Sequence, residues 1–138
     1  MKLVIDTNVI FSSFLKANSE ELYIIESAIH EVYLCGFTGI ELFKNKEKIL
    51  KYSQLREEQI LNAYQLLVEN TKAIHEYEIP VDVYRQAEEL CEGVDQKDTV
   101  YVAAALFLDA NLWTGDKKLK EGLIKKGFSK VVQTSELV

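Results

Sequence analysis

The stretch LVIDTN, residues 3–8, places three apolar residues directly before an acid, a hydroxyl and an amide. The apolar residues are typical of a short buried strand, and Asp6 marks the point where that strand ends. A second stretch, LWTGDKKL at residues 112–119, has the same design near the other end of the chain. Both stretches indicate a buried strand that carries a carboxylate just beyond its carboxyl end.

Short apolar segments alternate with helical patterns along the rest of the chain. We expect strands at 2–5, 32–37, 72–79, 111–114 and 130–134, and helices at about 9–16, 40–52, 56–69, 80–91, 99–110 and 117–127. A further helix is expected after Ser19, with apolar residues at helical spacing at Leu22, Ile25, Ile29 and Val32. Strands that alternate with helices indicate a parallel sheet covered on both faces. The predicted fold class is therefore α/β, with a central parallel sheet of about four to five strands flanked by helices.

Length and composition are typical of a globular protein with one core. The chain has 138 residues, so we expect a single domain over residues 1–138. Hydrophobic residues make up 48% of the chain and charged residues 28%, unlike a disordered chain. No apolar run approaches the ~20 residues of a membrane span, and the two cysteines lie far apart in apolar surroundings. We therefore expect a cytoplasmic protein with reduced cysteines and no membrane contact.

The net charge of −6 argues against a protein that coats nucleic acid through its overall charge. Lysines are nevertheless concentrated in two segments, at residues 44–51 and 117–130. Such runs are usually solvated helix faces. They can also form a rim that contacts phosphates around an acidic site.

Four acids from distant parts of the sequence follow predicted strands or begin predicted helices: Asp6, Glu41, Asp98 and Asp116. Ligands of open parallel sheets bind outside the carboxyl ends of the strands, so these carboxylates are expected to converge at one edge. Gathering like charges without a counter-ion is costly. An oxygen-only ligand set selects Mg²⁺ or Mn²⁺ over zinc, so the pattern favours a divalent cation of this kind.

Each acid also has a purely structural interpretation. Thr38 and Glu41 have the spacing of a capping box at the start of a helix. Asp98 and Asp116 can each act as an N-cap, and Asp6 can open a turn. The sequence leaves these alternatives open for each acid taken singly.

Other chemistries common in α/β proteins lack their motifs. There is no G-x-G-x-x-G after the first strand, no P-loop and no G-x-S-x-G, which excludes the usual nucleotide-binding and hydrolase patterns. Neither cysteine has a plausible histidine partner, and His30 and His75 lie among polar residues typical of a surface. What remains is metal-assisted chemistry on an anionic substrate.

The chain resembles the PIN domains, metal-dependent ribonucleases that include VapC-type toxins. VIDTNVI is similar to the opening motif of that family, GIEL to its second acidic motif, DQKDTVYVAAAL to the third and LWTGDKKL to the fourth. The resemblance covers essentially the whole chain. It implies that Mg²⁺ or Mn²⁺ is held by an acidic quartet, with two polar supporting residues: Asp6, Glu41, Asp98 and Asp116, supported by Asn8 and Thr114.

Asp95 departs from this simple assignment, because it lies three residues before Asp98 and would share a helix face with it. Either acid can be the cation ligand. We assign Asp98 to that role, because it leads directly into the buried helix, and Asp95 to a supporting one. Lys117 and Lys118, next to Asp116, are candidate contacts for the substrate phosphate and can equally be solvated.

The resemblance implies a Mg²⁺- or Mn²⁺-dependent endoribonuclease that hydrolyses RNA phosphodiester bonds, as the toxin of a toxin–antitoxin pair. The partners it implies are an RNA substrate, a small protein antitoxin and a second copy of the chain. One alternative is a PIN-fold binding or scaffold module without nuclease activity. Another is a receiver-like Mg²⁺-binding signalling domain, which needs a phosphoacceptor aspartate at the end of the third strand, where the sequence YEIP offers none.

Overall fold

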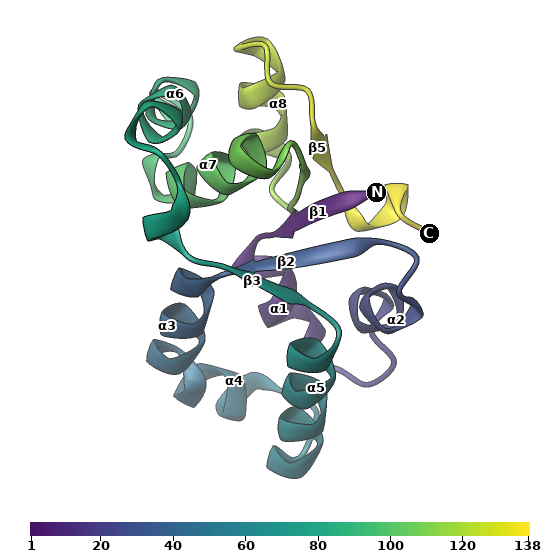
Figure 1. The fold of residues 1–138 in the computed structure, drawn as a ribbon. Coiled ribbons are helices and arrows are strands. Elements are labelled where there is room, and N and C mark those ends of the chain that lie inside the picture. Colours follow the sequence, from purple (N-terminus) through teal and green to yellow (C-terminus); the bar gives the residue numbers. More distant parts are fainter.

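A five-stranded, fully parallel sheet forms the centre of the computed structural model, which describes all of residues 1–138 (Figure 1). The strands are β1 (Lys2–Ile5), β2 (Glu31–Cys35), β3 (Lys72–Ile74), β4 (Asn111–Trp113) and β5 (Val131–Val132). They lie side by side in the order β3-β2-β1-β4-β5. The predicted α/β class with four to five parallel strands is confirmed.

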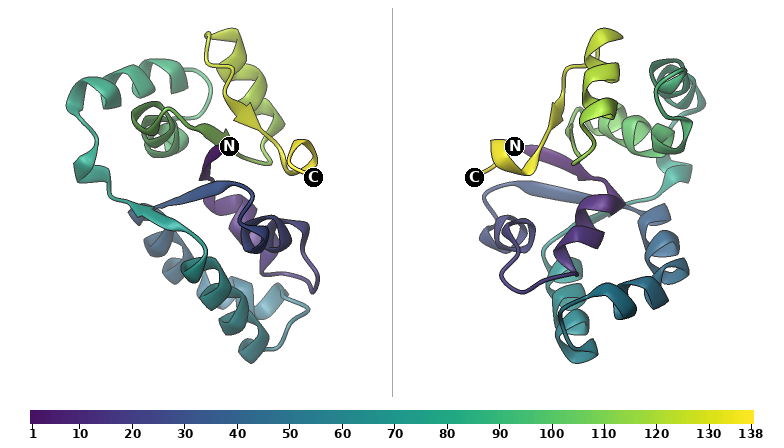
Figure 2. Two further views of the ribbon diagram at one scale, coloured as in Figure 1. Left: turned by 45° about the vertical axis from the view of Figure 1, so that its right-hand side comes forward. Right: turned by 180° about the vertical axis from the view of Figure 1, so that it is seen from behind.

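Helices cover both faces of the sheet (Figure 2). They are α1 (Thr7–Ser13), α2 (Glu20–Ser27), α3 (Gly36–Lys44), α4 (Lys46–Tyr52), α5 (Glu57–Glu69), α6 (Val81–Cys91), α7 (Thr99–Leu108) and α8 (Lys117–Lys125), with short 3-10 turns at Glu76–Glu78, Gln96–Asp98 and Thr134–Glu136. The first five helices pack on one face and the last three on the other (Figure 1). None of these helices is long and apolar enough to cross a membrane.

The apolar run before Asp6 explains why β1 lies in the middle of the sheet. Successive side chains of a strand point to opposite faces. Leu3 and Ile5 therefore pack in the cluster beneath α1 to α5, while Val4 packs in the cluster beneath α6 to α8. All three are fully buried, as only a central strand covered on both faces allows.

Helix α7 is buried as the all-round apolar pattern of residues 99–110 predicts, although it ends at Leu108. Residues 101–105 are all buried, three of them alanines, and α7 packs against α6 and β1. Small side chains allow this close approach to the sheet. The helix begins directly after Asp98, so its packing also fixes where that acid lies.

The single helix expected at 40–52 is wrong. Two helices occupy this region, and α3 begins at Gly36, four residues earlier than expected and directly after β2. Thr38 consequently lies inside α3 with its side chain buried, and the N-cap is Cys35. The capping-box interpretation of Thr38 and Glu41 is therefore wrong as well.

Two further predictions differ from the structure at element ends. Helix α2 ends at Ser27 because Ala28 adopts a left-handed conformation with φ of 57°, so Ile29 is exposed and Val32 belongs to β2. The strand expected at 72–79 is only three residues long, since the 3-10 turn at Glu76–Glu78 follows it. In both places a local turn ends the element while the apolar pattern continues.

Gly122, in the middle of α8, lies where α8 packs against the loop before Asp95. A Cβ atom added to Gly122 would lie 2.6 Å from Cγ1 of Val94, closer than two carbon atoms can approach. The absence of a side chain at this position therefore allows α8 to come close to the segment that carries Asp95.

Gly122→Ala should consequently destabilise the protein by about 1–3 kcal/mol, the usual cost of overpacking a buried contact. Gly39→Ala is the matched control, because Gly39 is also inside a helix but has no atom within 4 Å of an added Cβ. There the better helix propensity of alanine should stabilise the protein by up to about 1 kcal/mol. Denaturant unfolding of both variants measures the difference, and equal effects would contradict the close packing at Gly122.

Candidate functional site

The predicted acids lie at the carboxyl-terminal edge of the sheet. Asp6 directly follows β1, Asp116 follows β4, and Glu41 is on α3, the helix that follows β2. Asp98 ends the 3-10 turn that leads into α7. Four segments that are distant in sequence therefore deliver one carboxylate each to this edge.

Both carboxylate oxygens of Asp6 accept hydrogen bonds within the protein. Its side chain is only 3% exposed. One carboxylate oxygen, Oδ1, accepts a hydrogen bond from the backbone N–H of Asn8 at 3.1 Å, which makes Asp6 the N-cap of α1. The other, Oδ2, accepts one from the hydroxyl of Thr114 at 3.0 Å. The structural interpretation of Asp6 is therefore confirmed, since its carboxylate caps α1, and its role as a cation ligand stays a prediction.

Thr114 connects Asp6 to the fourth acid. Its buried hydroxyl donates to Asp6 and accepts a hydrogen bond from the backbone N–H of Asp116 at 3.1 Å. The Oδ1 atom of Asp116 accepts from the backbone N–H of Leu119 at 3.1 Å, so Asp116 is the N-cap of α8. Thr114 therefore forms a direct hydrogen-bonded bridge between two of the acids.

Glu41 is oriented by hydroxyl groups that the sequence reasoning missed. Its Oε1 atom accepts hydrogen bonds from the hydroxyls of Thr7, at 2.8 Å, and of Tyr101. The hydroxyl of Thr38 lies 3.0 Å from that of Thr7 and can donate to it, since the single proton of Thr7 goes to Glu41. The signal for Tyr101 was its place in a helix expected to be buried, because a buried tyrosine hydroxyl needs a hydrogen-bond partner.

Asp95, Asp98 and Asp116 come together most closely. One carboxylate oxygen of each lies within 4.8 Å of the others. Asp95 is half-buried and its Oδ1 accepts from the backbone N–H of Lys97 at 2.9 Å. Asp95 thus lies beside Asp98, on the turn that leads into α7, and belongs to the same group of acids.

Burial and mutual repulsion raise the pKa of two of these acids. Burial, followed by the charges of Asp6, Asp95 and Asp116, raises the pKa of Asp98 to about 7. The pKa of Asp6 is raised mainly by burial and further by Glu41 and Asp116, against the hydrogen bonds from Asn8 and Thr114. No lysine or arginine forms an ion pair with any of these acids, since the three ion pairs of the protein are elsewhere.

This arrangement fits a hard divalent cation. The donor set contains only oxygen atoms, and the acids repel one another in a partly buried place without a compensating side chain. Oxygen ligands of this kind suit Mg²⁺ or Mn²⁺. A cation would supply the positive charge that the side chains around it do not.

The other predicted residues are Asn8, Lys117 and Lys118, whose side chains form no hydrogen bond or ion pair with the acids. Asn8 is exposed, and it lines a cavity of about 490 Å³ with Glu41 and another of about 290 Å³ with Asp116. Only its backbone N–H bonds to Asp6. Lys117 and Lys118 are exposed on the first turn of α8 and form no ion pair. Their ammonium groups are therefore free for an anionic ligand.

Comparisons with known proteins agree with this fold. A family model described as PIN domain matches residues 4–136. Ribonuclease VapC1 of Methanocaldococcus jannaschii is 29% identical over 128 residues, which are 92% of this chain and 85% of that protein.

Two solved structures have a similar fold. A chain in the crystal structure of VapBC2 from Rickettsia felis bound to a promoter DNA fragment has a TM-score of 0.67 and 15% identity, over 96% of this chain and 98% of that one. A chain in a toxin–antitoxin complex from Klebsiella pneumoniae has a TM-score of 0.64 and 18% identity, over 96% and 97%.

The raised pKa of Asp98 makes the stability of the metal-free protein depend on pH. The group titrates near its ordinary value of 3.8 when unfolded and near 7 when folded. Between these values the folded protein keeps a proton that the unfolded chain has lost, so the free energy of unfolding should fall as pH rises. Melting temperatures in chelator from pH 4.5 to 8 should show this decline.

Asp98→Asn should flatten that decline, because an amide has no proton to lose in this range. The control is Asp82→Asn, which removes an exposed aspartate on α6 outside the acid cluster and should keep the wild-type slope. An Asp98→Asn protein with the same pH dependence as wild type would contradict the assignment of the slope to this group.

Proposed function

The chain belongs to the PIN domain family, and from this premise we propose that it is a ribonuclease that hydrolyses RNA phosphodiester bonds with the help of Mg²⁺ or Mn²⁺. The observation that carries the proposal is the group of Asp95, Asp98 and Asp116, whose carboxylate oxygens lie within 4.8 Å of one another at the end of a parallel sheet. The relation to a protein named ribonuclease, over nearly the whole chain, supports RNA as the substrate.

The proposed ligands of the cation are the four acids of the predicted quartet, Asp6, Glu41, Asp98 and Asp116, with Asp95 beside Asp98 in a supporting role. When bound, a divalent cation of this kind activates water for attack and stabilises the charge that develops on the phosphate. Phosphodiester hydrolysis needs both contributions, because the nucleophile is weak and the substrate is already anionic.

The chain itself keeps these acids in position. Thr114 donates to Asp6 and accepts from the backbone of Asp116, so it fixes two acids relative to each other. Tyr101 and Thr7 donate to the same oxygen of Glu41 and leave its second oxygen free. Hydrogen bonds to groups around a metal site orient the ligands and are often as important as the ligands.

Lys117 and Lys118 are the proposed contacts for the RNA backbone. Both follow Asp116 directly, are exposed and have no acidic partner. Ammonium groups at this place would attract the phosphates on either side of the scissile bond, which the acids alone would repel.

We further propose that the protein is the toxin of a toxin–antitoxin pair and is inhibited by a small protein. The similar solved structures are a VapBC complex and a toxin–antitoxin complex. This chain also has exposed apolar side chains on α3, α4 and α5, among them Phe43, Leu50 and Leu61, around an apolar cavity of about 390 Å³. Such a surface suits a protein partner or a second copy of the chain.

Purified protein should cut RNA in Mg²⁺ or Mn²⁺ and lose that activity in chelator. Asp6→Asn and Asp116→Asn should each reduce the rate by about 100-fold or more, the usual loss when a metal ligand or its charge is removed. Sequencing of RNA ends measures the cleavage, with Asp82→Asn as the control. Wild-type rates in both site variants would refute the proposal and favour a binding or scaffold role without nuclease activity.

Asp98→Asn should reduce the rate more than Asp95→Asn. Asp98 is only 8% exposed and is repelled by both Asp6 and Asp116, whereas one oxygen of Asp95 is already engaged by the backbone of Lys97. Cleavage rates of both variants on one RNA test this prediction. A larger loss in Asp95→Asn would make Asp95 the cation ligand and Asp98 the supporting acid.

A further inference from the structure

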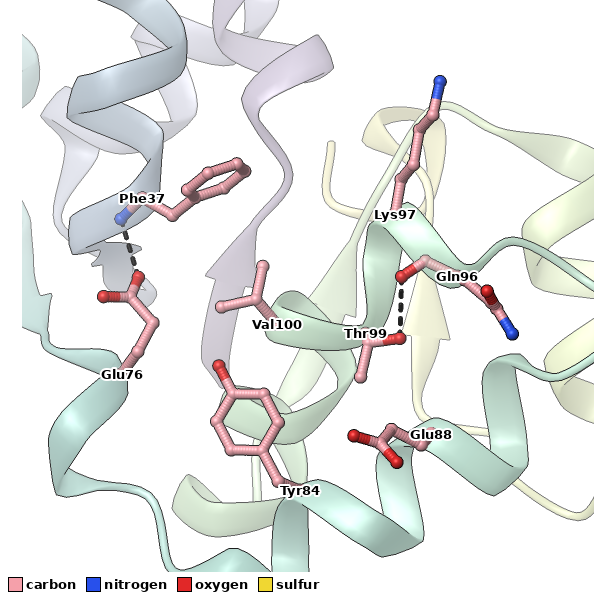
Figure 3. A pocket seen from close by; sticks show the side chains of 8 residues that line it. All are labelled: Phe37, Glu76, Tyr84, Glu88, Gln96, Lys97, Thr99 and Val100. Atoms are coloured by element: carbon pink, nitrogen blue, oxygen red, sulfur yellow. Dashed lines mark hydrogen bonds between the residues drawn. The ribbon is translucent and has the colours of Figure 1, made fainter.

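A cavity of about 610 Å³ lies beside the acid cluster, where the start of α3 faces α6 and the start of α7 (Figure 3). Its lining residues are Phe37, Glu76, Tyr84, Glu88, Gln96, Lys97, Thr99 and Val100. Lys97 and Thr99 are the two neighbours of Asp98 in the chain. The cavity therefore borders the candidate site and has the size of a pocket for a small organic group.

Two aromatic rings form opposite walls of this cavity. Figure 3 shows Phe37 on one side and Tyr84 on the other, with Val100 between them. Phe37 is 36% exposed and Tyr84 is half-buried, so part of each side chain is accessible to a ligand in the cavity. Aromatic side chains beside the candidate site suit an unstacked nucleobase, which such rings bind by stacking.

The cavity has one free carboxylate among its polar groups. Glu76 is engaged, since its Oε1 accepts from the backbone N–H of Phe37 at 2.6 Å. The Thr99 hydroxyl donates to the carbonyl of Gln96 at 2.8 Å. The carboxylate of Glu88 has neither a hydrogen bond nor an ion pair within the protein, and Figure 3 shows it beside Tyr84 and below Thr99.

The charge of the cavity decides which part of a nucleotide it admits. Two glutamates line it against one lysine, so a phosphate would be repelled from its interior. Lys97, exposed and adjacent to Asp98, lies where the cavity meets the acid cluster. A nucleotide with its base in the cavity would keep its phosphate outside, at the lysine and the acids.

A carboxylate discriminates among the four bases, because it accepts hydrogen bonds and cannot donate them. Guanine presents two adjacent donors on its Watson–Crick edge, N1–H and the N2 amino group. Adenine and cytosine present one donor beside an acceptor, and uracil one donor between two carbonyl groups, so each places an acceptor against the carboxylate. Guanine is the only base that can satisfy both oxygens of Glu88 at once.

We propose that this cavity is a guanine-binding subsite, in which the base packs against the rings of Phe37 and Tyr84 and donates two hydrogen bonds to Glu88. The inference rests on the proposed ribonuclease function and extends it from RNA in general to RNA with a guanine at a fixed position from the cut. Phe37 and Tyr84 supply affinity for any base, and Glu88 supplies the preference.

Binding in chelator tests the subsite without strand cleavage. The ligands are labelled six-nucleotide RNAs in which one guanosine among uridines is replaced by inosine, which lacks the N2 amino group, or by adenosine. Wild-type protein should bind the inosine RNA about fivefold more weakly, for one lost hydrogen bond, and the adenosine RNA about tenfold or more weakly. Fluorescence anisotropy measures the three affinities.

Glu88→Gln should remove the preference for guanosine over inosine and most of the preference over adenosine, because a carboxamide can pair with a neighbouring donor and acceptor on each of these bases. Glu89→Gln is the matched control, because Glu89 is an exposed glutamate on the same helix outside the cavity and its loss changes the charge equally. It should keep the wild-type preference. Both substitutions are at exposed positions, and unchanged melting curves establish that the fold is intact.

Equal affinity of wild-type protein for the guanosine and inosine RNAs, or no binding of either, would overturn the subsite. So would a Glu88→Gln protein that discriminates like wild type. RNA ends mapped in Mg²⁺ then separate the two proposals. Cleavage without any guanine preference would leave the ribonuclease function standing and remove the subsite. A guanosine preference in binding without any cleavage would leave the subsite standing and remove the ribonuclease function.

Discussion

The pairing of β1 with β4 is the contact on which the site depends. These strands are joined in register from Leu3 with Asn111 to Ile5 with Trp113, and the backbone N–H of Asp6 extends the ladder to the carbonyl of Trp113. The chain runs outward from β1 through β2 and β3, then returns to the other side of β1 with β4 and β5. The carboxyl ends of β1 and β4 therefore lie at the point where the strand order reverses, where open α/β sheets bind their ligands.

The acids are held at this point by bonds that the fold needs in any case. Asp6 and Asp116 each use one oxygen to cap a helix, and Thr114 bonds to the second oxygen of Asp6 and to the backbone of Asp116. Hydrogen bonds that favour the charged carboxylate offset part of the cost of burial and repulsion. Asp98 lacks such a cap bond, and it is the acid whose pKa rises to about 7. The site is thus built from helix starts, with its least compensated charge at Asp98.

Local patterns were enough to predict the parallel sheet and the position of most acids. An apolar run that stops at an acid marks the end of a buried strand, and this signal identified Asp6 and Asp116. The hydroxyl network around Glu41 could not be read in this way, because Thr7, Thr38 and Tyr101 meet only through the packing of α1, α3 and α7. The cavity beside Asp98 could not be predicted for the same reason, because four segments that are separate in the sequence form its walls. The early start of α3 was missed because residues 36 and 37 were assigned to the strand expected at 32–37, with Thr38 and Gly39 as its end.

The strand order also governs when the acid cluster is completed during synthesis of the protein. The three strands β1, β2 and β3, together with Asp6 and Glu41, leave the ribosome before β4 has been made. Until then β1, the most buried strand of the finished protein, is an open edge with unpaired backbone groups, a place where nascent chains associate wrongly. A nascent chain therefore has no complete acid cluster, and one that stops before Asp116 never acquires it.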